Sequence, residues 1–356
     1  MSTTSQFPDS LEHIGFRAWK HPEAPKRILV IRIQAMGDLF ATFPLISSLK
    51  ERFPQTKIDL LVRADYAEFA EAFPMFNKVI RVKGSTSSLK KVLFLCMTLP
   101  SLWFQKYDIV LDLQRNRSSR WVRRLLFPKS WTEFDRFGPK SPLIRNQWSI
   151  EQLGFSPLPP SYSFVRTFSQ LPSMEEKLLA AGWDGISSLV VVNPAGYCET
   201  RSWPLTHYRS WMESWLQSQP NTQFLFLGLH IIGDKVKQLE MVDNARIVNL
   251  VGQTSILEMY GILIRSQLVL SEDSGLGHLA WLSGVKTVML LGSTRSDWTS
   301  PIGEHTFCFN SNHLPCGNCM AFECPLKTNA CMRDLEPSAV LNAALSLFLK
   351  PEPTTT

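Results

Sequence analysis

The stretch 271–278 joins a polar turn to a glycine-rich helix start, and its residue types suit phosphate binding. An apolar run at 268–270 precedes the turn and leucines recur at helical spacing from Leu276, which predicts a strand, a tight loop and a helix. Free N–H groups and the positive dipole end at a helix N-terminus can hold a phosphate. The residues in position to bind it are Asp273, Ser274, Gly275 and, one turn later, His278. The alternative is an ordinary N-cap formed by Asp273 or Ser274.

A second glycine turn follows the apolar run 189–193 and is followed by an arginine. Asn193 and Gly196 belong to the turn, and Arg201 comes five residues after the glycine. Because a guanidinium matches a phosphate in a bidentate way, this turn could hold a diphosphate. Asp234, which follows the apolar run 223–228, could accept a hydrogen bond from a ribose hydroxyl. The alternative for Asp234 is a surface loop residue.

A carboxylate stands at the tip of the first predicted strand–helix turn. Asp38 directly follows Gly37, where it could act as a general base for a hydroxyl nucleophile. The alternative is that Asp38 caps a helix that begins at Leu39. The chain contains no Gly-x-Gly-x-x-Gly, no Walker motif and no Gly-x-Ser-x-Gly elbow, so the residues do not support dinucleotide-fingerprint binding or those classes of chemistry.

A basic run lies at 115–124, directly after the predicted strand that ends at Leu113. In open α/β sheets ligands bind at the carboxyl ends of the strands, so the arginines expected to bind an anion there are Arg115, Arg117 and Arg120. The alternative is a solvated helix face.

Four cysteines lie within 16 residues at the end of the second half, which are Cys316, Cys319, Cys324 and Cys331. Four thiolates at short spacings are the usual ligands of a tetrahedral Zn or Fe site. We therefore predict a structural Zn or Fe site in this loop and no catalytic use of the cysteines. The alternative is four reduced thiols.

Two series of alternating strands and helices position these residues. The predicted strands are 27–33, 57–62, 78–82 and 107–113 in the first half, and 189–193, 223–228, 246–250, 268–270 and 286–292 in the second, where the last closes the sheet. Predicted helices include 39–53, 89–104 and 338–349. This alternation predicts an α/β chain with two Rossmann-like, doubly wound parallel sheets around a central cleft. A Pro- and Ser-rich segment at 156–175 sets the expected domains at 1–170 and 171–356, with polar, loosely ordered ends at 1–25 and 350–356.

Charge is distributed unevenly along the 356 residues, which carry a formal net charge of +6. Residues 1–166 contain 25 Lys and Arg against 14 Asp and Glu, and the remainder contains 12 against 17. The basic half is expected to face a polyanion or an anionic membrane surface. The sequence has no signal peptide and no apolar run long enough to cross a bilayer, so we expect a cytoplasmic protein whose seven cysteines are thiols or metal ligands.

Taken together, these stretches resemble the ADP-heptose:lipopolysaccharide heptosyltransferases, glycosyltransferase family 9. The resemblance spans 27–349 and is carried by 27–38 (RILVIRIQAMGD), 193–196 (NPAG) with 201–204 (RSWP), and 271–279 (SEDSGLGHL). The segment 316–334, followed by Pro337, resembles the cysteine-containing tail of some members. Gln34 stands where the family usually has Ser, and no residue is clearly placed as the family's ribose-binding acid.

The resemblance implies a GT-B fold and an inverting, metal-independent transfer of heptose from ADP-heptose to an acceptor of the lipopolysaccharide inner-core type. It gives Asp38 the role of catalytic base, Arg201 that of a contact to the donor diphosphate, and 273–278 that of a donor-binding loop. The first domain would bind an anionic glycolipid at the cytoplasmic face of the inner membrane, as a peripheral contact, and the second the nucleotide sugar.

Two other hypotheses remain open from the sequence. One keeps the fold but uses another nucleotide sugar, or a protein acceptor as in heptosyltransferases that modify autotransporters. The other is a non-catalytic protein in which the cysteine loop and the basic run bind nucleic acid. Nucleic acid fits poorly, because the two features lie in opposite halves and no aromatic-rich platform for single strands is evident.

Overall fold

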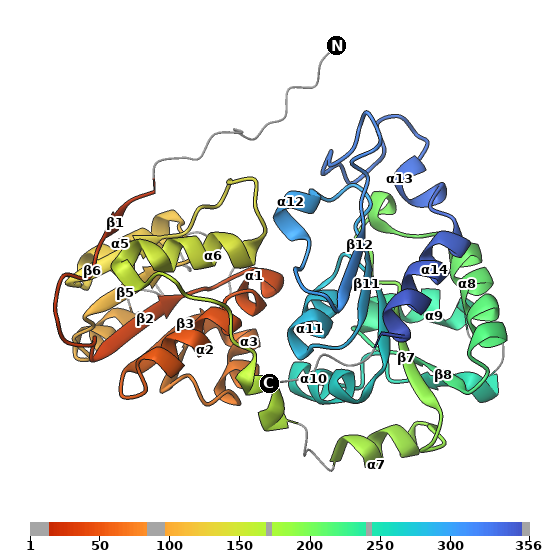
Figure 1. The fold of residues 1–356 in the computed structure, drawn as a ribbon, viewed down its shortest axis with the longest axis horizontal. Helices are drawn as coiled ribbons and strands as arrows, with labels where there is room; N and C mark the ends of the chain where they lie inside the picture. Colours follow the sequence, from red (N-terminus) through yellow and green to blue (C-terminus); the bar gives the residue numbers. More distant parts are fainter. Residues whose placement is uncertain (1–13, 84–96, 169–172, 240–243, 351–356) are drawn as a thin grey trace. The chain divides into compact units, whose positions relative to one another are not determined.

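The computed structural model describes residues 14–83, 97–168, 173–239 and 244–350. The chain divides into two compact units, Met1–Thr167 and Phe168–Thr356, called unit 1 and unit 2 below. Each unit is a six-stranded sheet with helices on both of its faces (Figure 1). None of the helices in the described ranges has the length and apolar character needed to cross a membrane. The predicted pair of Rossmann-like, parallel-sheet domains is therefore confirmed.

The sheet of unit 1 has the strand order β1-β6-β5-β2-β3-β4. Its strands are β1 Phe16–Arg17, β2 Arg27–Ile31, β3 Lys57–Arg63, β4 Lys78–Val82, β5 Ile109–Asp112 and β6 Ser130–Glu133. All pairs are parallel except β1 with β6. Four consecutive residues of β2, from Ile28 to Ile31, are fully buried, as expected for a central parallel strand covered on both faces.

Helices and a phenylalanine cluster cover this sheet. The helices are α1 Met36–Phe40, α2 Phe43–Arg52, α3 Ala64–Glu71, α5 Arg117–Leu125 and α6 Pro142–Ile150, with a π-helical turn at Glu151–Phe155 and a 3₁₀ segment at Ser163–Phe168. Residues 97–103 are also helical. The rings of Phe43 and Phe73 meet edge to face with centroids 4.9 Å apart, and Phe69 stacks on Phe43 at 5.8 Å.

The sheet of unit 2 repeats the pattern in the order β12-β11-β10-β7-β8-β9, with every pair parallel. Its strands are β7 Ser188–Asn193, β8 Thr222–Phe226, β9 Ile247–Asn249, β10 Leu268–Glu272, β11 Thr287–Leu290 and β12 Thr306–Phe309. In both units the direction of the strand order reverses once. The reversal lies between β2 and β5 in unit 1 and between β7 and β10 in unit 2. Ligands of open α/β sheets bind at such switch points.

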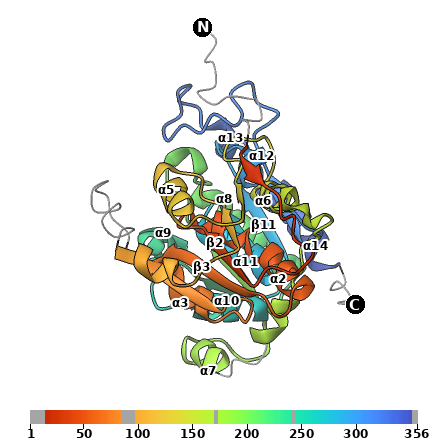
Figure 2. The same ribbon diagram turned by 90° about the vertical axis from the view of Figure 1, so that its left-hand side faces the viewer.

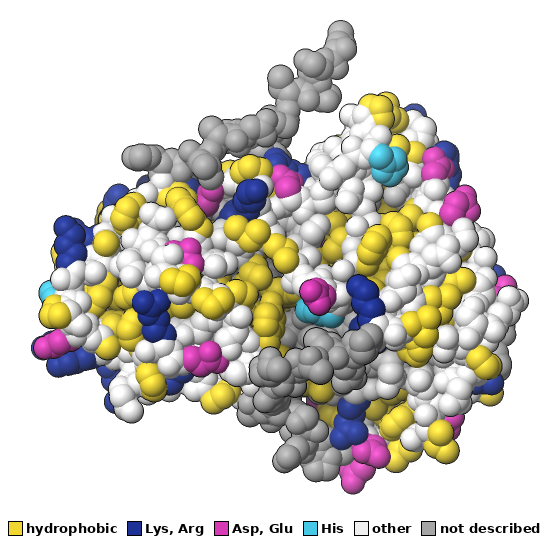
Figure 3. All heavy atoms as spheres, viewed as in Figure 1, with side chains coloured by type: hydrophobic (Ala, Val, Ile, Leu, Met, Phe, Trp, Pro, Cys, Tyr) yellow, Lys and Arg dark blue, Asp and Glu magenta, His cyan; other side chains and the backbone are white. Residues whose placement is uncertain are grey.

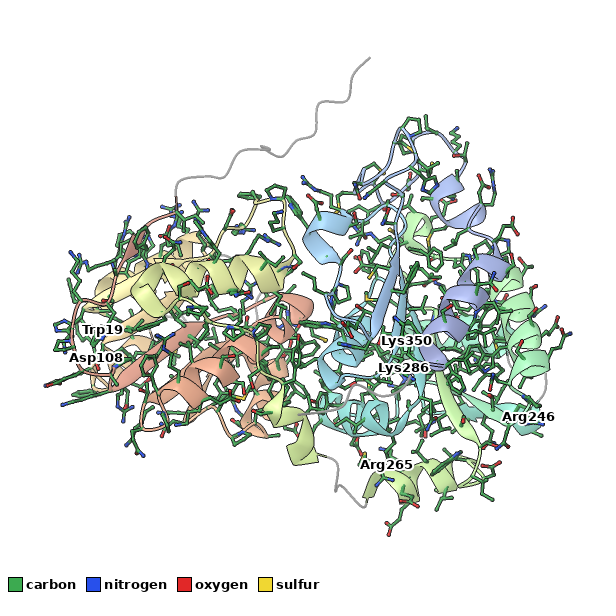
Figure 4. The ribbon with its side chains drawn as sticks, in the orientation of Figure 1. Trp19, Asp108, Arg246, Arg265, Lys286 and Lys350 are labelled. Carbon is green, nitrogen blue, oxygen red and sulfur yellow. The ribbon has the colours of Figure 1, made fainter. Side chains whose placement is uncertain are left out.

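The helices of unit 2 pack on both faces of this sheet (Figures 1 and 2). They are α7 Ser173–Ala180, α8 Leu205–Ser218, α9 Gly233–Leu239, α10 Ile256–Arg265, α11 Gly275–Ser283, α12 Ser296–Thr299, α13 Ala330–Arg333 and α14 Pro337–Phe348, with 3₁₀ turns at Glu199–Arg201, His230–Ile232 and Asn244–Arg246. Trp211 and Trp215 of α8 stack in the core with centroids 5.3 Å apart. Lys286, labelled with Lys350 in Figure 4, donates to the carbonyl of Phe348, the last residue of α14, and to that of Lys350 beyond it. These bonds satisfy carbonyl groups at the end of the helix.

Three sequence predictions need correction. The predicted helix 39–53 is two helices, because Pro44 lies in the first turn of α2 and favours a new helix start there. Part of the predicted loose lead-in is β1, a two-residue strand too short to leave a periodic signal. The sheet of unit 2 is closed by β12, which pairs outside β11. Of the predicted helix 89–104, residues 89–96 lie outside the described residues, and residues 351–356 of the predicted C-terminal tail do so too.

Candidate active site

In unit 1 the switch point brings Asp38 and a buried arginine together. Asp38 is the third residue of α1, and the helix N-cap is Ala35, with no side-chain cap bond. The alternative in which Asp38 caps the helix is therefore wrong. Its carboxylate is about one-third exposed, and Oδ1 lies 3.1 Å from Nη2 of Arg32. Asp38 is thus both accessible and paired.

Arg32 is a residue that the sequence reasoning missed. Its side chain is 1% exposed, donates from Nη1 to the carbonyl of Leu113 after β5, and lies with its guanidinium 4.4 Å from the ring centroid of Phe134. Burial lowers the pKa of Arg32, and Asp38 opposes that change. An arginine directly after an apolar strand is the signal that could have been followed, since arginine is rarely buried unless it is paired.

A pocket of about 510 Å³ opens beside the end of β5. Five arginines line it with two aromatic side chains and an asparagine: Arg115, Arg117, Arg120, Arg124, Arg136, Trp121, Phe137 and Asn116. The structure thus brings the three predicted arginines together and adds two. We call this site the arginine pocket.

Acidic side chains beneath the pocket hold part of it in place. Glu133 at the end of β6 lies within 3.5 Å of Arg115 and within 3.3 Å of Arg120, and Asp112 accepts the backbone N–H of Arg115 at 2.9 Å. Burial raises the pKa of Asp112 to about 6, against hydrogen bonds from Ser119 and Arg115. Among the described residues, Arg117, Arg124 and Arg136 have no carboxylate within ion-pair distance. The pocket therefore offers positive charge to an anion.

In unit 2 the switch point brings together the two predicted turns. Ser274 is the N-cap of α11 and its hydroxyl accepts from the N–H of Gly277 at 3.2 Å, so the cap is Ser274 and not Asp273. The same hydroxyl lies 3.1 Å from Oδ1 of Asn193 at the end of β7. Asn193 in turn donates to the carbonyl of Leu227. Gly275 is the first residue of α11, where its N–H belongs to the free helix end.

Asp273 lies beside both basic side chains of this site, Arg201 and His278. Its Oδ2 accepts from the hydroxyl of Thr294 at 2.6 Å and lies 3.5 Å from Nη1 of Arg201, and its Oδ1 lies 3.8 Å from Nε2 of His278. Burial opposes ionisation, but the nearby His278, the hydrogen bond from Thr294 and the charge of Arg201 together lower the pKa of Asp273. Asp273 therefore orients two side chains that a phosphate could contact.

Two further predicted residues differ in their setting. Gly196 is necessary where it stands, because a Cβ there would collide with the carbonyl of Arg201 and lie 2.7 Å from Glu272. Asp234 lies at the start of α9 with its side chain 96% exposed and 3.7 Å from Lys237, which is the setting of a surface residue. Sequence reasoning missed Thr294, which contacts Asp273, and Glu272 and Lys235, which contact the turn of Gly196.

Cys316, Cys319 and Cys324 lie in the loop before α13, and Cys331 lies in α13 itself. This segment packs against the turn of Arg201. The hydroxyl of Thr200 donates to the carbonyl of Ala321 at 2.5 Å, and Cys331 lies 3.6 Å from the carbonyl of Thr200. Burial first, and then the neighbouring Cys319, Cys324 and Cys316, raise the pKa of Cys331 to about 11. Over the described ranges, no group of three or more His, Cys, Asp or Glu is positioned to hold a metal ion.

Comparison with known proteins agrees with this arrangement. The model of glycosyltransferase family 9 (heptosyltransferase) matches residues 167–330. The lipooligosaccharide heptosyltransferase 2 of Campylobacter jejuni subsp. jejuni is 24% identical over 325 residues, which cover 88% of this chain and 95% of that protein.

Solved structures share the fold. A family 9 glycosyltransferase from Veillonella parvula has a TM-score of 0.75 at 16% identity and covers 92% of this chain and 98% of its own. An E. coli heptosyltransferase with ADP-2-deoxy-2-fluoro heptose has a TM-score of 0.64 at 17% identity and covers 89% and 98%. The fold is thus that of GT-B heptosyltransferases. Residues 167–330 thus match the glycosyltransferase family 9 model, and distant homologues of the chain are lipopolysaccharide and lipooligosaccharide heptosyltransferases.

Proposed function

We propose that the protein transfers a heptose, with inversion, from ADP-heptose to an anionic glycolipid acceptor of the lipopolysaccharide inner-core type. The observation that carries this proposal is that each switch point holds one half of the necessary chemistry. Unit 1 has an accessible carboxylate beside an arginine pocket. Unit 2 has a helix N-terminus beside Arg201 and His278.

The donor diphosphate would bind at the N-terminus of α11. Backbone N–H groups at this helix end, together with the guanidinium of Arg201, supply positive charge where negative charge develops as the sugar leaves. The contacts of Asp273 with Arg201 and His278 preorganise these groups. Because protein groups supply this charge, we propose that the transfer needs no divalent cation. Asn193, Ser274 and Gly196 would shape the same site, and Asp234 is the weakest member of the proposed set because its side chain points to solvent.

Asp38 would act as the base. Its carboxylate takes the proton of the acceptor hydroxyl, whose oxygen then bonds to the anomeric carbon while the bond from that carbon to the diphosphate oxygen breaks and ADP leaves. The guanidinium of Arg32, held by Leu113 and Phe134, fixes the direction of the carboxylate. Positioning of this kind matters because small displacements of a catalytic group are costly.

The arginine pocket would bind the phosphate or carboxylate groups of the acceptor. A guanidinium pairs with either group through two parallel hydrogen bonds. The predicted contacts are Arg115, Arg117 and Arg120, and the pocket lining adds Arg124 and Arg136.

A second feature of unit 1 supports peripheral contact with an anionic membrane. A groove of about 910 Å³ at the amino ends of the strands is lined by six Lys or Arg and one acid, Asp108, which Lys129 already pairs at 2.7 Å. Asp108 is labelled in Figure 4 near Trp19. Trp103 and Phe127 at this groove are 55% and 79% exposed. Aromatic side chains among cations suit the interface of an anionic bilayer, and Figure 3 shows Lys and Arg among hydrophobic side chains on the surface of unit 1.

This contact is tested by sedimentation with vesicles of phosphatidylcholine alone or with one-third phosphatidylglycerol. Binding only to the anionic vesicles, lost in Trp103→Ser with Phe127→Ser and kept in the control Ile186→Ser of unit 2, is the expected result. Equal sedimentation of all three proteins would contradict it.

The cysteine loop would bind one structural Zn or Fe. Support comes from the spacing of the four cysteines within 16 residues and from Cys324, which accepts the backbone N–H of Asn329 at 3.4 Å. The N–H groups of Asn329 and Thr328 lower the pKa of Cys324 to about 7, which favours the thiolate that a metal needs. Elemental analysis of the purified protein should find about one Zn or Fe per chain, and metal-free, fully folded protein would contradict the site.

The reaction itself is tested by incubating the protein with ADP-heptose and a heptose-free inner-core glycolipid in the presence of a chelator. A glycolipid heavier by one heptose, with release of ADP, is expected. The second candidate function keeps the fold but uses another sugar nucleotide or a protein acceptor, and product formed only with these would favour it. High-affinity binding of nucleic acid with no transfer would revive the non-catalytic hypothesis.

A further inference from the structure

We infer that Glu272 is a positioning residue, whose buried carboxylate closes the turn 196–203 and so holds the guanidinium of Arg201 at the donor site. The inference deepens the proposed function and rests on it. Glu272 is the last residue of β10 and is 0% exposed. It cannot touch a substrate from there, so any effect on the donor must pass through the residues that it holds.

The carboxylate joins the two ends of the turn. Oε2 accepts the backbone N–H of Gly196, and Oε1 accepts the backbone N–H of Trp203 at 2.5 Å. Each oxygen thus binds one end, and the segment between them, which includes Arg201, is drawn into a closed loop on β10. Bonds from backbone N–H groups to a carboxylate are stronger than those to a neutral acceptor.

Other contacts brace the same loop from within and from α9. Ser202 donates to the carbonyl of Cys198 at 3.0 Å. Lys235 lies 3.9 Å from Glu272 and donates to the carbonyl of Pro194 and to the hydroxyl of Ser202, both at 3.1 Å. A side chain at Gly196 would collide with the carbonyl of Arg201. The backbone of Gly196 is therefore packed closely against that of Arg201.

The link to the donor site is the adjacency of Glu272 and Asp273. Glu272 fixes the backbone of the turn, and Asp273, the next residue, lies 3.5 Å from the guanidinium of Arg201. One acid therefore holds the two ends of the turn that carries Arg201, and the other lies beside its guanidinium. Both acids stand at the end of β10, so the guanidinium is fixed relative to the N-terminus of α11.

The variant Glu272→Gln tests whether Glu272 acts through its two hydrogen bonds to the turn or only fills space in the core. The amide has nearly the shape of the carboxylate but offers one oxygen and one N–H₂ group, so one of the two backbone N–H groups would face a donor instead of an acceptor. One end of the turn should open while the core stays packed. Gln267→Ala is the matched control, because Gln267 accepts a backbone N–H from Leu189 beside the other end of β10.

The test is calorimetric titration of the full chain with ADP and with adenosine, in the wild type, Glu272→Gln, Arg201→Ala and the double variant. Loss of a positioned guanidinium should weaken ADP binding on the order of 10-fold in Glu272→Gln, leave adenosine binding unchanged, and add nothing in the Arg201→Ala background. Glu272→Asp, which keeps two acceptor oxygens, should recover part of the ADP affinity, and it replaces Glu272→Gln if that variant does not fold.

The outcomes distinguish the two proposals. If Arg201→Ala weakens ADP binding but Glu272→Gln does not, or if the two effects add in full, the positioning role is overturned and the donor site stands. An equal loss of affinity for ADP and adenosine in Glu272→Gln, or a similar loss in Gln267→Ala, would also overturn it. If Arg201→Ala leaves ADP binding unchanged, the proposed donor site fails and the role of Glu272 fails with it.

Discussion

The guanidinium of Arg32 is almost completely buried, yet its Nη2 lies 3.1 Å from the partly exposed carboxylate of Asp38. The arginine is fixed by the carbonyl of Leu113 and by the ring of Phe134, so the pair is anchored from the protein side. An anchored cation beside an accessible carboxylate gives that carboxylate one orientation, which is what a general base needs.

Replacing Asp38 tests its role as the base. Asp38→Asn should lower kcat on the order of 100-fold or more, because the amide cannot take the proton from the hydroxyl group of the acceptor glycolipid. Binding of ADP, measured by calorimetry, should stay unchanged. Asp65→Asn is the control, since Asp65 is an exposed acid of α3 that pairs with Arg63. An Asp38→Asn enzyme with wild-type turnover would remove this carboxylate from the mechanism.

Replacing Arg32 by lysine should separate orientation from charge. Lysine keeps the positive charge but cannot reach both Leu113 and Asp38 with a planar fork, so kcat should fall about 10-fold while the KM for the donor stays the same. Steady-state kinetics with ADP-heptose measure both, and far-ultraviolet circular dichroism checks the fold. If kcat is retained, the pair serves only the packing of unit 1.

Replacing two arginines of the pocket tests acceptor binding. Arg124→Ala with Arg136→Ala should raise the KM for the acceptor by about 10-fold or more, as expected for the loss of charge-assisted hydrogen bonds, and should weaken its dependence on salt. The control is Arg81→Ala, because Arg81 pairs with Glu71 and does not line the pocket. If the KM for ADP-heptose changes and the KM for the acceptor does not, the pocket does not bind the acceptor and its assignment is wrong.

The buried carboxylate of Glu272 predicts a pH dependence of stability. Burial raises the pKa of Glu272 to about 7, against the nearby Lys235 and the N–H groups of Trp203 and Gly196, while the unfolded value is about 4.3. The folded state then binds the proton more tightly, so this group contributes stability that is full below pH ~4 and is lost as the pH rises through ~7.

Urea unfolding at several pH values measures this effect. The free energy of unfolding of the wild type, taken relative to Glu272→Gln, should fall between pH ~4 and ~7 by on the order of 3 kcal/mol and stay level above that range. Tyr208, whose pKa is raised by burial and then by Glu272, stays neutral throughout. A difference that is constant with pH would mean that burial does not raise the pKa of Glu272.

Much of the fold is predictable because parallel strands leave long apolar runs. The predicted strand 78–82 is β4 itself, and the predicted runs around Val30 and Val191 became the central strands of the two sheets. Two strands were not predicted: β1 has only two residues, which are too few for periodicity to register, and β12 is an edge strand with no buried residue.

The residues of the candidate site are predictable where they follow the end of a strand, and not where they reach the site from another element. Asp38, Arg201 and Asp273 stand next to glycine turns or directly after strands, and the sequence pointed to them. Lys235 reaches the turn of Arg201 from α9, and Arg136 enters the arginine pocket from the connection between β6 and α6. Their roles depend on tertiary packing, which spacing along the chain does not encode.

The most direct test of the central claim is calorimetric titration with ADP-heptose, GDP-mannose and UDP-glucose, with a chelator present, in the wild type and in Arg201→Ala. The account predicts selective binding of ADP-heptose by the wild type and a loss of roughly 1.5–3 kcal/mol in the variant, the scale of hydrogen bonds to a charged group. Binding of another sugar nucleotide in preference, or equal affinity in Arg201→Ala, would contradict it.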